Sequence, residues 1–242
     1  MLYKSRAIVI HSIRYGETSL IVHLITEQYG RQAFMVKGAR SKKAALRANL
    51  FFPLNLLQIE AYYRPNASLQ RLKEATPAPI YATLHNNPIK SSVALFLAET
   101  LFRVVQAEHH NHELFDYIYE SLLLYDSMES NYHNFHLIFL IQLLRYEGFL
   151  PTMNYSEENS IFSLPAGRFL PPNRAHMGDM DEISSHKFAR LLQCNFANMS
   201  EVQLTANERM YLLNKLIEYL QIHLHEFPPI KSLPVLHEVF KF

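Results

Sequence analysis

The densest group of reactive side chains in this 242-residue sequence is a basic segment over residues 37–47. It holds no acidic residue, and its cations are Lys37, Arg40, Lys42, Lys43 and Arg47. Cations at this density neutralise the phosphates of a polyanion and release its counterions. Gly38 allows a ligand to approach the backbone closely, and Ser41 offers a hydroxyl to a phosphate oxygen. The segment therefore predicts contact with a phosphate backbone.

Lysine and arginine are also concentrated in the first third of the chain. Residues 1–80 carry 12 Lys and Arg against 4 Asp and Glu, whereas residues 81–242 carry 11 against 18. A charge division this sharp indicates two domains with different partners. Further cations extend the predicted phosphate-binding track less directly. They are Arg14, Arg31 and Arg71, with Arg64 and Lys73 in the same part of the chain.

Aromatic residues accompany these cations. Stacking of a base on an aromatic ring contributes about 1–3 kcal/mol. The candidates are Tyr15, Tyr29, Phe34, Tyr62 and Tyr63. Because Phe34 lies in an alternating apolar pattern, we expect it in the core, and no single ring is chosen as a stacking platform.

Covalent catalysis and metal binding find little support. The sequence has no nucleophile elbow, phosphate-binding loop or paired-histidine zinc motif. His109, His110 and His112 are too close together to converge on one ion, and the lone Cys194 excludes a site built on cysteine pairs. The acidic clusters at 157–158 and 179–182 read as solvated loops. We predict no catalytic residue, no metal ligand and no cofactor.

The first domain, residues 1–80, reads as strands joined by short turns. Alternating apolar residues predict strands over residues 7–14, 19–26, 31–37, 51–63 and 68–75. Five short strands without room for crossover helices predict an antiparallel barrel, and the OB-fold is the small barrel of this size.

The hydrophobic period changes to that of helices in the second domain, residues 81–242. Helical spacing runs over residues 91–108, 113–125, 134–146 and 184–193, and a fifth helix follows a capping box at Thr205 and Glu208. A loop-rich insert is expected at about 152–182. The predicted fold class is a multidomain α+β protein, in which an N-terminal OB-fold barrel precedes a bundle of about five or six helices.

Short motifs spread over the chain resemble the bacterial RecO family of recombination mediators and DNA-repair proteins. Each motif is brief, but their order and spacing are specific and cover nearly the whole length. The matching segments are 7–10 with 14–19, 24–30, 36–40, 53–54 with 69–75, 145–151, and 231–233 with 235–236.

The resemblance implies an OB-fold, a helical C-terminal domain and no bond-cleaving chemistry. It implies binding to single- and double-stranded DNA and annealing of complementary strands. It also implies contact with RecR and with the C-terminal tail of the single-strand-binding protein, and so indirect help in loading RecA. Many members carry four cysteines as a zinc module where this chain has none over residues 152–184. We expect the insert to be held by Phe162, Leu164, Phe169 and Leu170 instead.

The cellular setting follows from the same features. The chain starts with an alternating apolar segment rather than a secretory one, and the apolar run over residues 135–144 is about half of a membrane span. With a single cysteine, this favours a reducing, cytoplasmic setting at the nucleoid, away from the membrane.

Two other functions remain open at this point. A metal-dependent nuclease needs carboxylates or histidines near its basic groove, and residues 1–80 offer only Glu17, Glu27, Glu60 and Glu74, spread apart. An RNA-binding protein is the other alternative, because OB barrels accept RNA as readily as DNA.

Overall fold

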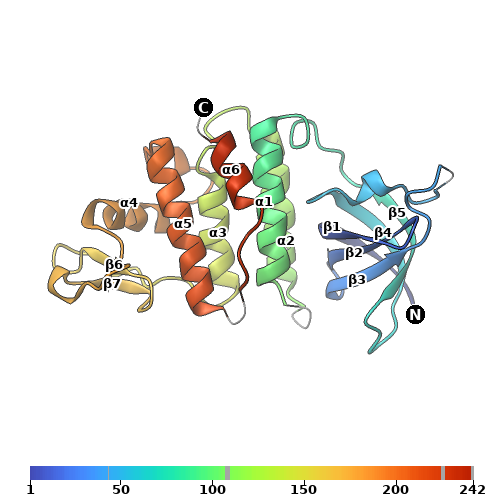
Figure 1. The fold of residues 1–242 in the computed structure, drawn as a ribbon, viewed down its shortest axis with the longest axis horizontal. Helices are drawn as coiled ribbons and strands as arrows, with labels where there is room; N and C mark the ends of the chain where they lie inside the picture. Colours follow the sequence, from blue (N-terminus) through green and yellow to red (C-terminus); the bar gives the residue numbers. More distant parts are fainter. Residues whose placement is uncertain (43, 107–109, 225–226, 241–242) are drawn as a thin grey trace. The chain divides into compact units, whose positions relative to one another are not determined.

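The computed structural model describes residues 1–42, 44–106, 110–224 and 227–240 (Figure 1). These residues form two compact units. The first contains residues 1–127 and 230–239, and the second contains residues 128–229 with Phe240. The first unit therefore combines a barrel with helices that lie before and after the second unit in the sequence. The predicted division at residue 80 follows the change in sequence pattern and stays a prediction.

Among the described residues, five strands of the first unit close into a barrel, which confirms the predicted OB-like domain. The strands are β1 (Leu2–Tyr15), β2 (Ser19–Thr26), β3 (Gly30–Val36), β4 (Leu56–Tyr62) and β5 (Gln70–Pro77). Their order around the barrel is β1-β2-β3-β5-β4. Neighbours pair antiparallel except β3 and β5, whose short parallel contact matches Phe34 with Gln70 and Met35 with Arg71.

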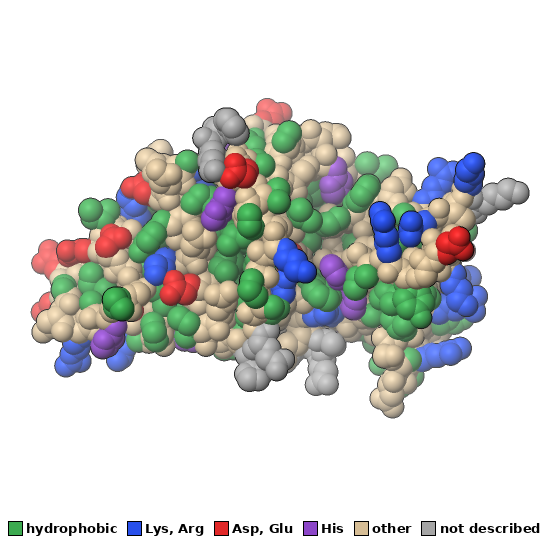
Figure 2. Space-filling view, viewed as in Figure 1, with side chains coloured by type: hydrophobic (Ala, Val, Ile, Leu, Met, Phe, Trp, Pro, Cys, Tyr) green, Lys and Arg blue, Asp and Glu red, His purple; other side chains and the backbone are tan. Residues whose placement is uncertain are grey.

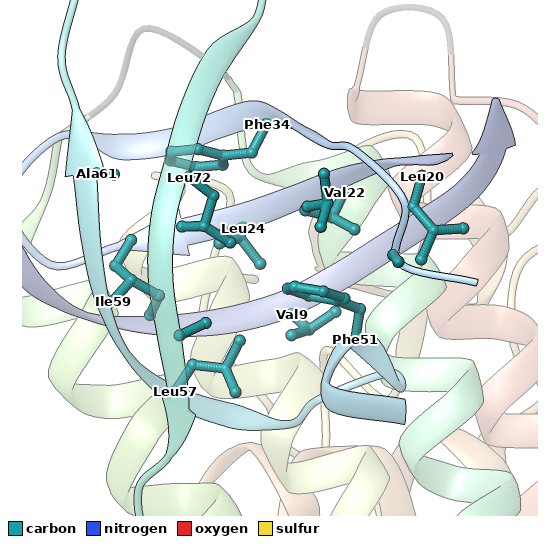
Figure 3. Packing of buried hydrophobic residues seen from close by; sticks show 14 of the residues in the cluster. Val9, Leu20, Val22, Leu24, Phe34, Phe51, Leu57, Ile59, Ala61 and Leu72 are labelled. Atoms are coloured by element: carbon teal, nitrogen blue, oxygen red, sulfur yellow. The ribbon is translucent and has the colours of Figure 1, made fainter. Parts of the chain in front are cut away.

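The barrel interior follows from the alternation of apolar residues along the strands (Figure 3). Val22, Leu24 and Phe34 point inward and are fully buried, as a period of two requires. The register of β1 against β2 shifts between Val9 and His11, and an irregularity of this kind bends a strand and helps a small sheet to close.

The fourth strand begins later than the sequence pattern predicts. The pattern predicted a strand over residues 51–63, but a 3₁₀ turn spans Ala48–Phe51 and β4 starts at Leu56. Leu54 takes a positive φ of 61°, which no strand permits, and its amide donates to the carbonyl of Val9. Phe51, 2% exposed, packs into the core at this point. The early residues of the predicted strand therefore cover the barrel instead of joining its ladder.

Three helices complete the first unit. They are α1 (Pro88–Val104), α2 (His112–Ser127) and α6 (Leu233–Val239). Arg6 of β1 links the barrel to α2, because its guanidinium bonds Glu27 in the β2–β3 turn and Asp116 at 2.7 Å. The same guanidinium lies 4.7 Å from the ring centroid of Tyr119. A planar cation that meets two carboxylates and a ring fixes orientation as well as distance.

The second unit is built around α3 (Phe135–Tyr146), which is buried on almost every side, as its continuous apolar run predicts. The helices α4 (Glu182–Leu192) and α5 (Ala206–His223) belong to the same unit. The capping box expected at the start of α5 is present, with Thr205 and Glu208 bonding reciprocally to backbone amides.

The insert contains a short hairpin that the sequence pattern did not reveal. Strands β6 (Ile161–Ser163) and β7 (Arg168–Leu170) pair antiparallel, and the ring of Phe162 packs against Phe169 and Phe188. Phe162, Leu164 and Phe169 are buried as expected, whereas Leu170 is half-buried. In the described part of the chain, no three His, Cys, Asp or Glu side chains gather as a possible metal site. No helix in that part is long and apolar enough to cross a bilayer.

A carboxylate fixes α6 to α1. Glu99 accepts from the backbone amides of Lys231 and Ser232, from the Ser232 hydroxyl at 2.6 Å, and from Arg103. Burial alone would raise the pKa of Glu99, but these donors lower it to about 2. Because the folded pKa lies below the usual value of 4.5, this contribution to stability is present at neutral pH and is lost as the pH falls towards 2.

We predict that Glu99→Gln lowers the free energy of unfolding by about 1–3 kcal/mol at neutral pH, because the amides that begin α6 lose their charged acceptor. Urea titration measures this change, and limited proteolysis should cut the C-terminal segment sooner. Glu120→Gln on the exposed side of α2 is the control. Equal unfolding midpoints for the two variants would contradict the role given to Glu99.

His136 in α3 is fully buried, and neither ring nitrogen has a hydrogen-bond partner among the described residues. Burial, with smaller effects from Arg209 and His133, lowers the pKa of His136 from 6.5 to about 3. The folded protein keeps this ring neutral while the unfolded chain takes up a proton, so stability falls as the pH drops below 6.5.

We predict that His136→Phe flattens the loss of stability between pH 7 and 5, where one such group contributes a slope of up to about 1.4 kcal/mol per pH unit. Chemical denaturation over a pH series measures the slope. The exposed His176→Gln variant should keep the wild-type slope. An unchanged slope in His136→Phe would show that the ring is already protonated or compensated in the folded state.

Candidate nucleic-acid interface

The basic segment leaves the end of β3 as a series of turns. Gly38 takes a φ of +67°, a conformation that side chains disfavour, so the position suits glycine. The amide of Ser41 donates to the carbonyl of Gly38 at 3.0 Å, and that of Ala44 donates to Ser41 at 3.2 Å. These turns keep the segment short and folded beside the barrel.

Two apolar side chains anchor the segment on the barrel core. Ala39 is 3% exposed within the core, and Leu46 packs against the same cluster. Backbone bonds support them, from Ala48 to the carbonyl of Ala39 and from Arg40 to that of Thr18 in the β1–β2 turn. With its apolar residues directed inward, the segment exposes Lys37, Arg40, Lys42 and Arg47. Lys43 lies outside the described residues.

Arg40 lies near Arg14, a second cation of the predicted track. Both residues line a groove of about 320 Å³ beside the β1–β2 turn, together with Phe51 and Phe52. Phe52 is 57% exposed, which makes it an aromatic surface next to two guanidinium groups. The sequence reading placed Phe52 inside a strand and so missed it. The available signal was Pro53, which has no amide to donate to a strand ladder and therefore favours a strand that starts after it.

Lys37 and Arg71 meet on the other side of the segment. They line a groove of about 450 Å³ where β3 and β5 separate, with Arg64 and Lys73 beside them. The apolar residues Leu46, Leu69 and Leu72 also line this groove. The parallel register of β3 and β5 places Met35 opposite Arg71, and this register brings the end of β3 beside the start of β5.

Arg31 is the predicted cation that the structure does not bring to the basic segment. Six strand residues at about 3.3 Å each place it about 20 Å from Lys37 along β3. Its Nη1 donates to the carbonyls of Phe102 and Val105 at 2.7 and 2.9 Å, and the guanidinium lies 4.2 Å from the Phe102 ring centroid. It borders a neighbouring hollow of about 580 Å³ with Arg64. Arg31 thus satisfies the carbonyl end of α1.

The aromatic candidates divide in a similar way. Phe34 is fully buried, as expected. Tyr29 and Tyr63 stack on each other with centroids 4.1 Å apart, and Tyr62 lies beneath the Arg71 guanidinium at 5.6 Å. Tyr15, 54% exposed at the end of β1, keeps an accessible ring.

The cations of this surface have few carboxylate partners. Among the described residues, Lys73 pairs with Glu60 at 3.0 Å. With the described carboxylates, no such ion pair forms at the six exposed positions Arg14, Lys37, Arg40, Lys42, Arg47 and Arg71. Figure 2 shows several Lys and Arg side chains over the barrel on the visible face. A surface that gathers unpaired cations around one loop attracts polyanions.

The closed five-stranded barrel followed by helices places this protein in the class of small OB-like barrel proteins, a fold whose members bind oligonucleotides and oligosaccharides. The particular family follows from comparison with known proteins. Residues 1–81 match the model described as recombination protein O N terminal, and residues 85–234 match recombination protein O C terminal. The chain belongs to the recombination protein O family, which confirms the resemblance read from its motifs.

Relatives support this assignment over the full length. A protein of Bacteroides fragilis named DNA repair protein RecO is 37% identical over 241 residues, covering 99% of this chain and 100% of the relative. Proteins of the same name from Azobacteroides pseudotrichonymphae and Flavobacterium psychrophilum are 35% and 34% identical, with the same coverage.

The anchoring of the basic segment leads to a prediction about Leu46. Leu46→Ala removes apolar contact with the barrel core and lowers the free energy of unfolding by about 1 kcal/mol. The basic segment should then separate from the barrel more often. We expect trypsin to cleave native protein within residues 37–47 several-fold faster in this variant. Leu69→Ala, a more exposed leucine of the neighbouring groove, is the control and should be cut at the wild-type rate. Equal cleavage in all three proteins would mean that Leu46 does not hold the segment.

Proposed function

We propose that this chain is a non-enzymatic recombination mediator in DNA repair that binds single- and double-stranded DNA through the basic surface of its barrel. Membership of the recombination protein O family supports the repair role. The observation that carries the DNA contact is the set of exposed, unpaired cations around the segment over residues 37–47. Its core contacts are Lys37, Arg40, Lys42, Lys43 and Arg47, extended by Arg14 and Arg71.

The proposed surface reads the phosphate backbone and not the base sequence. Its charged groups are lysines and arginines on the basic segment, at the end of β1 and at the start of β5, and such groups position a strand but carry no sequence information. This suits a protein that acts on any broken end. Because phosphates are neutralised while base edges stay free, two complementary strands held in this way would repel each other less and pair. Annealing of complementary strands is therefore part of the proposed function.

The structure gives less support than the sequence for Arg31 as a phosphate contact. Its Nη1 is already bonded to two carbonyl oxygens of the α1 end, so a phosphate would have to compete with them or use the remaining donors. Arg64 and Lys73 line the groove that contains Lys37 and Arg71, and we add Arg64 to the candidate contacts.

The proposed partners follow from the family and from the division of charge. We propose that the protein works with RecR and the C-terminal tail of the single-strand-binding protein, and so helps to load RecA onto coated DNA. The acidic balance of residues 81–242 makes this part of the chain a poor second site for DNA and leaves it available to protein partners. The role places the protein in the cytoplasm, at the nucleoid.

The decisive experiment measures oligonucleotide binding over a salt series for the triple variant Arg40→Ala, Lys42→Ala, Arg47→Ala. Each lost phosphate contact lowers the log–log salt slope for single-stranded DNA by about 0.7, so we expect a decrease of about 2 together with weaker binding. A matched control removes three exposed arginines of the second unit, with Arg168→Ala, Arg174→Ala and Arg190→Ala. An unchanged slope in the first variant would remove the segment from the binding surface.

The same purified protein separates the alternative functions. Strand annealing with and without the single-strand-binding protein tests DNA binding and partner contact together. Cleavage of DNA that requires magnesium and disappears with a chelator would favour a nuclease. Stronger competition by RNA than by DNA of matched sequence would favour an RNA-binding role.

A further inference from the structure

Arg209 of α5 is a half-buried cation of the second unit that the proposed DNA contact does not use. Its Nε donates to Asn134 Oδ1 and its Nη2 donates to the carbonyl of Leu204, both at 3.0 Å. The guanidinium also lies 5.9 Å from the ring centroid of Phe240. These contacts fix its plane, but they occupy only part of its five donors.

No carboxylate balances this guanidinium among the described residues. The adjacent carboxylate, Glu208, is bonded instead to Lys187 and to the start of its own helix. His133 and His136 lie close enough to Arg209 for its charge to lower the pKa of both rings, after the larger effect of burial. A cation removed from bulk water without a counter-charge is costly, and a bound anion would offset that cost.

A small polar pocket opens beside the guanidinium. Its volume is about 100 Å³, and Arg209, Asn131, His133, Asn134, Ser200 and Gln203 line most of it. No aspartate or glutamate belongs to the lining. The hydroxyl of Ser200 and the ring of His133 offer hydrogen-bond donors beside the guanidinium. The volume suits one small anionic group.

Two helices begin at this pocket. Asn134 is the first cap residue of α3, and Leu204 directly precedes Thr205, the cap of α5. The amino end of α3 carries partial positive charge and favours an anion, whereas the amino end of α5 already holds the Glu208 carboxylate. Asn134 is held in place by its own amide, which donates to the carbonyls of Met199 and Val202. Asn134 is therefore fixed beside the guanidinium.

We propose that this pocket binds one oxyanion of phosphate or carboxylate size, with Arg209 as its charged ligand. The anion meets a planar guanidinium whose orientation two hydrogen bonds have already set, which is the geometry that suits bidentate contact. The site lies in the second unit and is independent of the basic surface on the barrel.

The test is the thermal stability and calorimetric titration of the full chain with inorganic phosphate, with chloride used to hold the ionic strength constant. A ligand that binds only the folded protein raises the melting temperature in a saturable way. Acetate and a short oligonucleotide are titrated in parallel, which distinguishes a free carboxylate or phosphate from the phosphate of a nucleic acid.

Two variants make the result specific. Arg209→Gln removes the charge but also disturbs the hydrogen bonds of Arg209 to Asn134 and Leu204. Gln203→Glu is the more specific change, because it places a carboxylate in the pocket and leaves the side chain of Arg209 in place. We expect Gln203→Glu to weaken phosphate binding about ten-fold or more. Gln193→Glu adds the same charge at an exposed position outside the lining and should bind as the wild type.

The double variant Lys42→Ala, Arg47→Ala separates this site from the barrel surface. Phosphate binding that survives in the double variant and is lost in Gln203→Glu supports the proposal. Binding that is lost in the double variant, or kept in Gln203→Glu, would place the anion elsewhere and overturn it. The absence of a saturable response to phosphate and acetate would overturn it as well.

Discussion

The closure of the barrel through the short parallel contact of β3 with β5 is the constraint on which the basic surface depends. Only Phe34 and Met35 pair across this seam, with Gln70 and Arg71. Because the strands then separate, the chain beyond β3 is free to fold back over the barrel, and the start of β5 lies beside it. The same register that seals the core thus brings Lys37 and Arg71 into one groove. A shift by one residue would send these side chains to opposite faces.

Much of this arrangement follows from local sequence pattern. Alternation predicted both ends of β2, because burial on one face leaves a period of two, and the continuous apolar run predicted α3 as a helix buried on almost every side. The predicted start of β4 was wrong because Phe51 and Leu54 are apolar for a different reason. They cover the barrel and do not join its strand ladder. Periodicity alone does not separate these two uses of an apolar side chain.

The sequence was enough to predict which residue types form the candidate site, but not which of the distant arginines belong to it. The cations of residues 37–47 are contiguous, so their common surface needed little tertiary information. Arg31 looks the same in the sequence, yet α1 supplies carbonyl acceptors for it from 71 residues away. Arg209 carries no sequence signal at all, because its environment is set by Asn134, 75 residues earlier. Long-range partners decide whether a given arginine faces solvent, a helix end or a pocket.

The attachment of α6 to α1 by Glu99 makes the first unit discontinuous along the chain. A ribosome releases the barrel, α1 and α2 early, whereas the residues that complete this unit emerge only after the whole of the second unit has been synthesised. Until then the surface of α1 that receives α6 stays uncovered, and any assembly that requires this surface must wait until α6 has been synthesised. Vectorial synthesis therefore gives the second unit time to fold as an insertion before the first unit becomes complete.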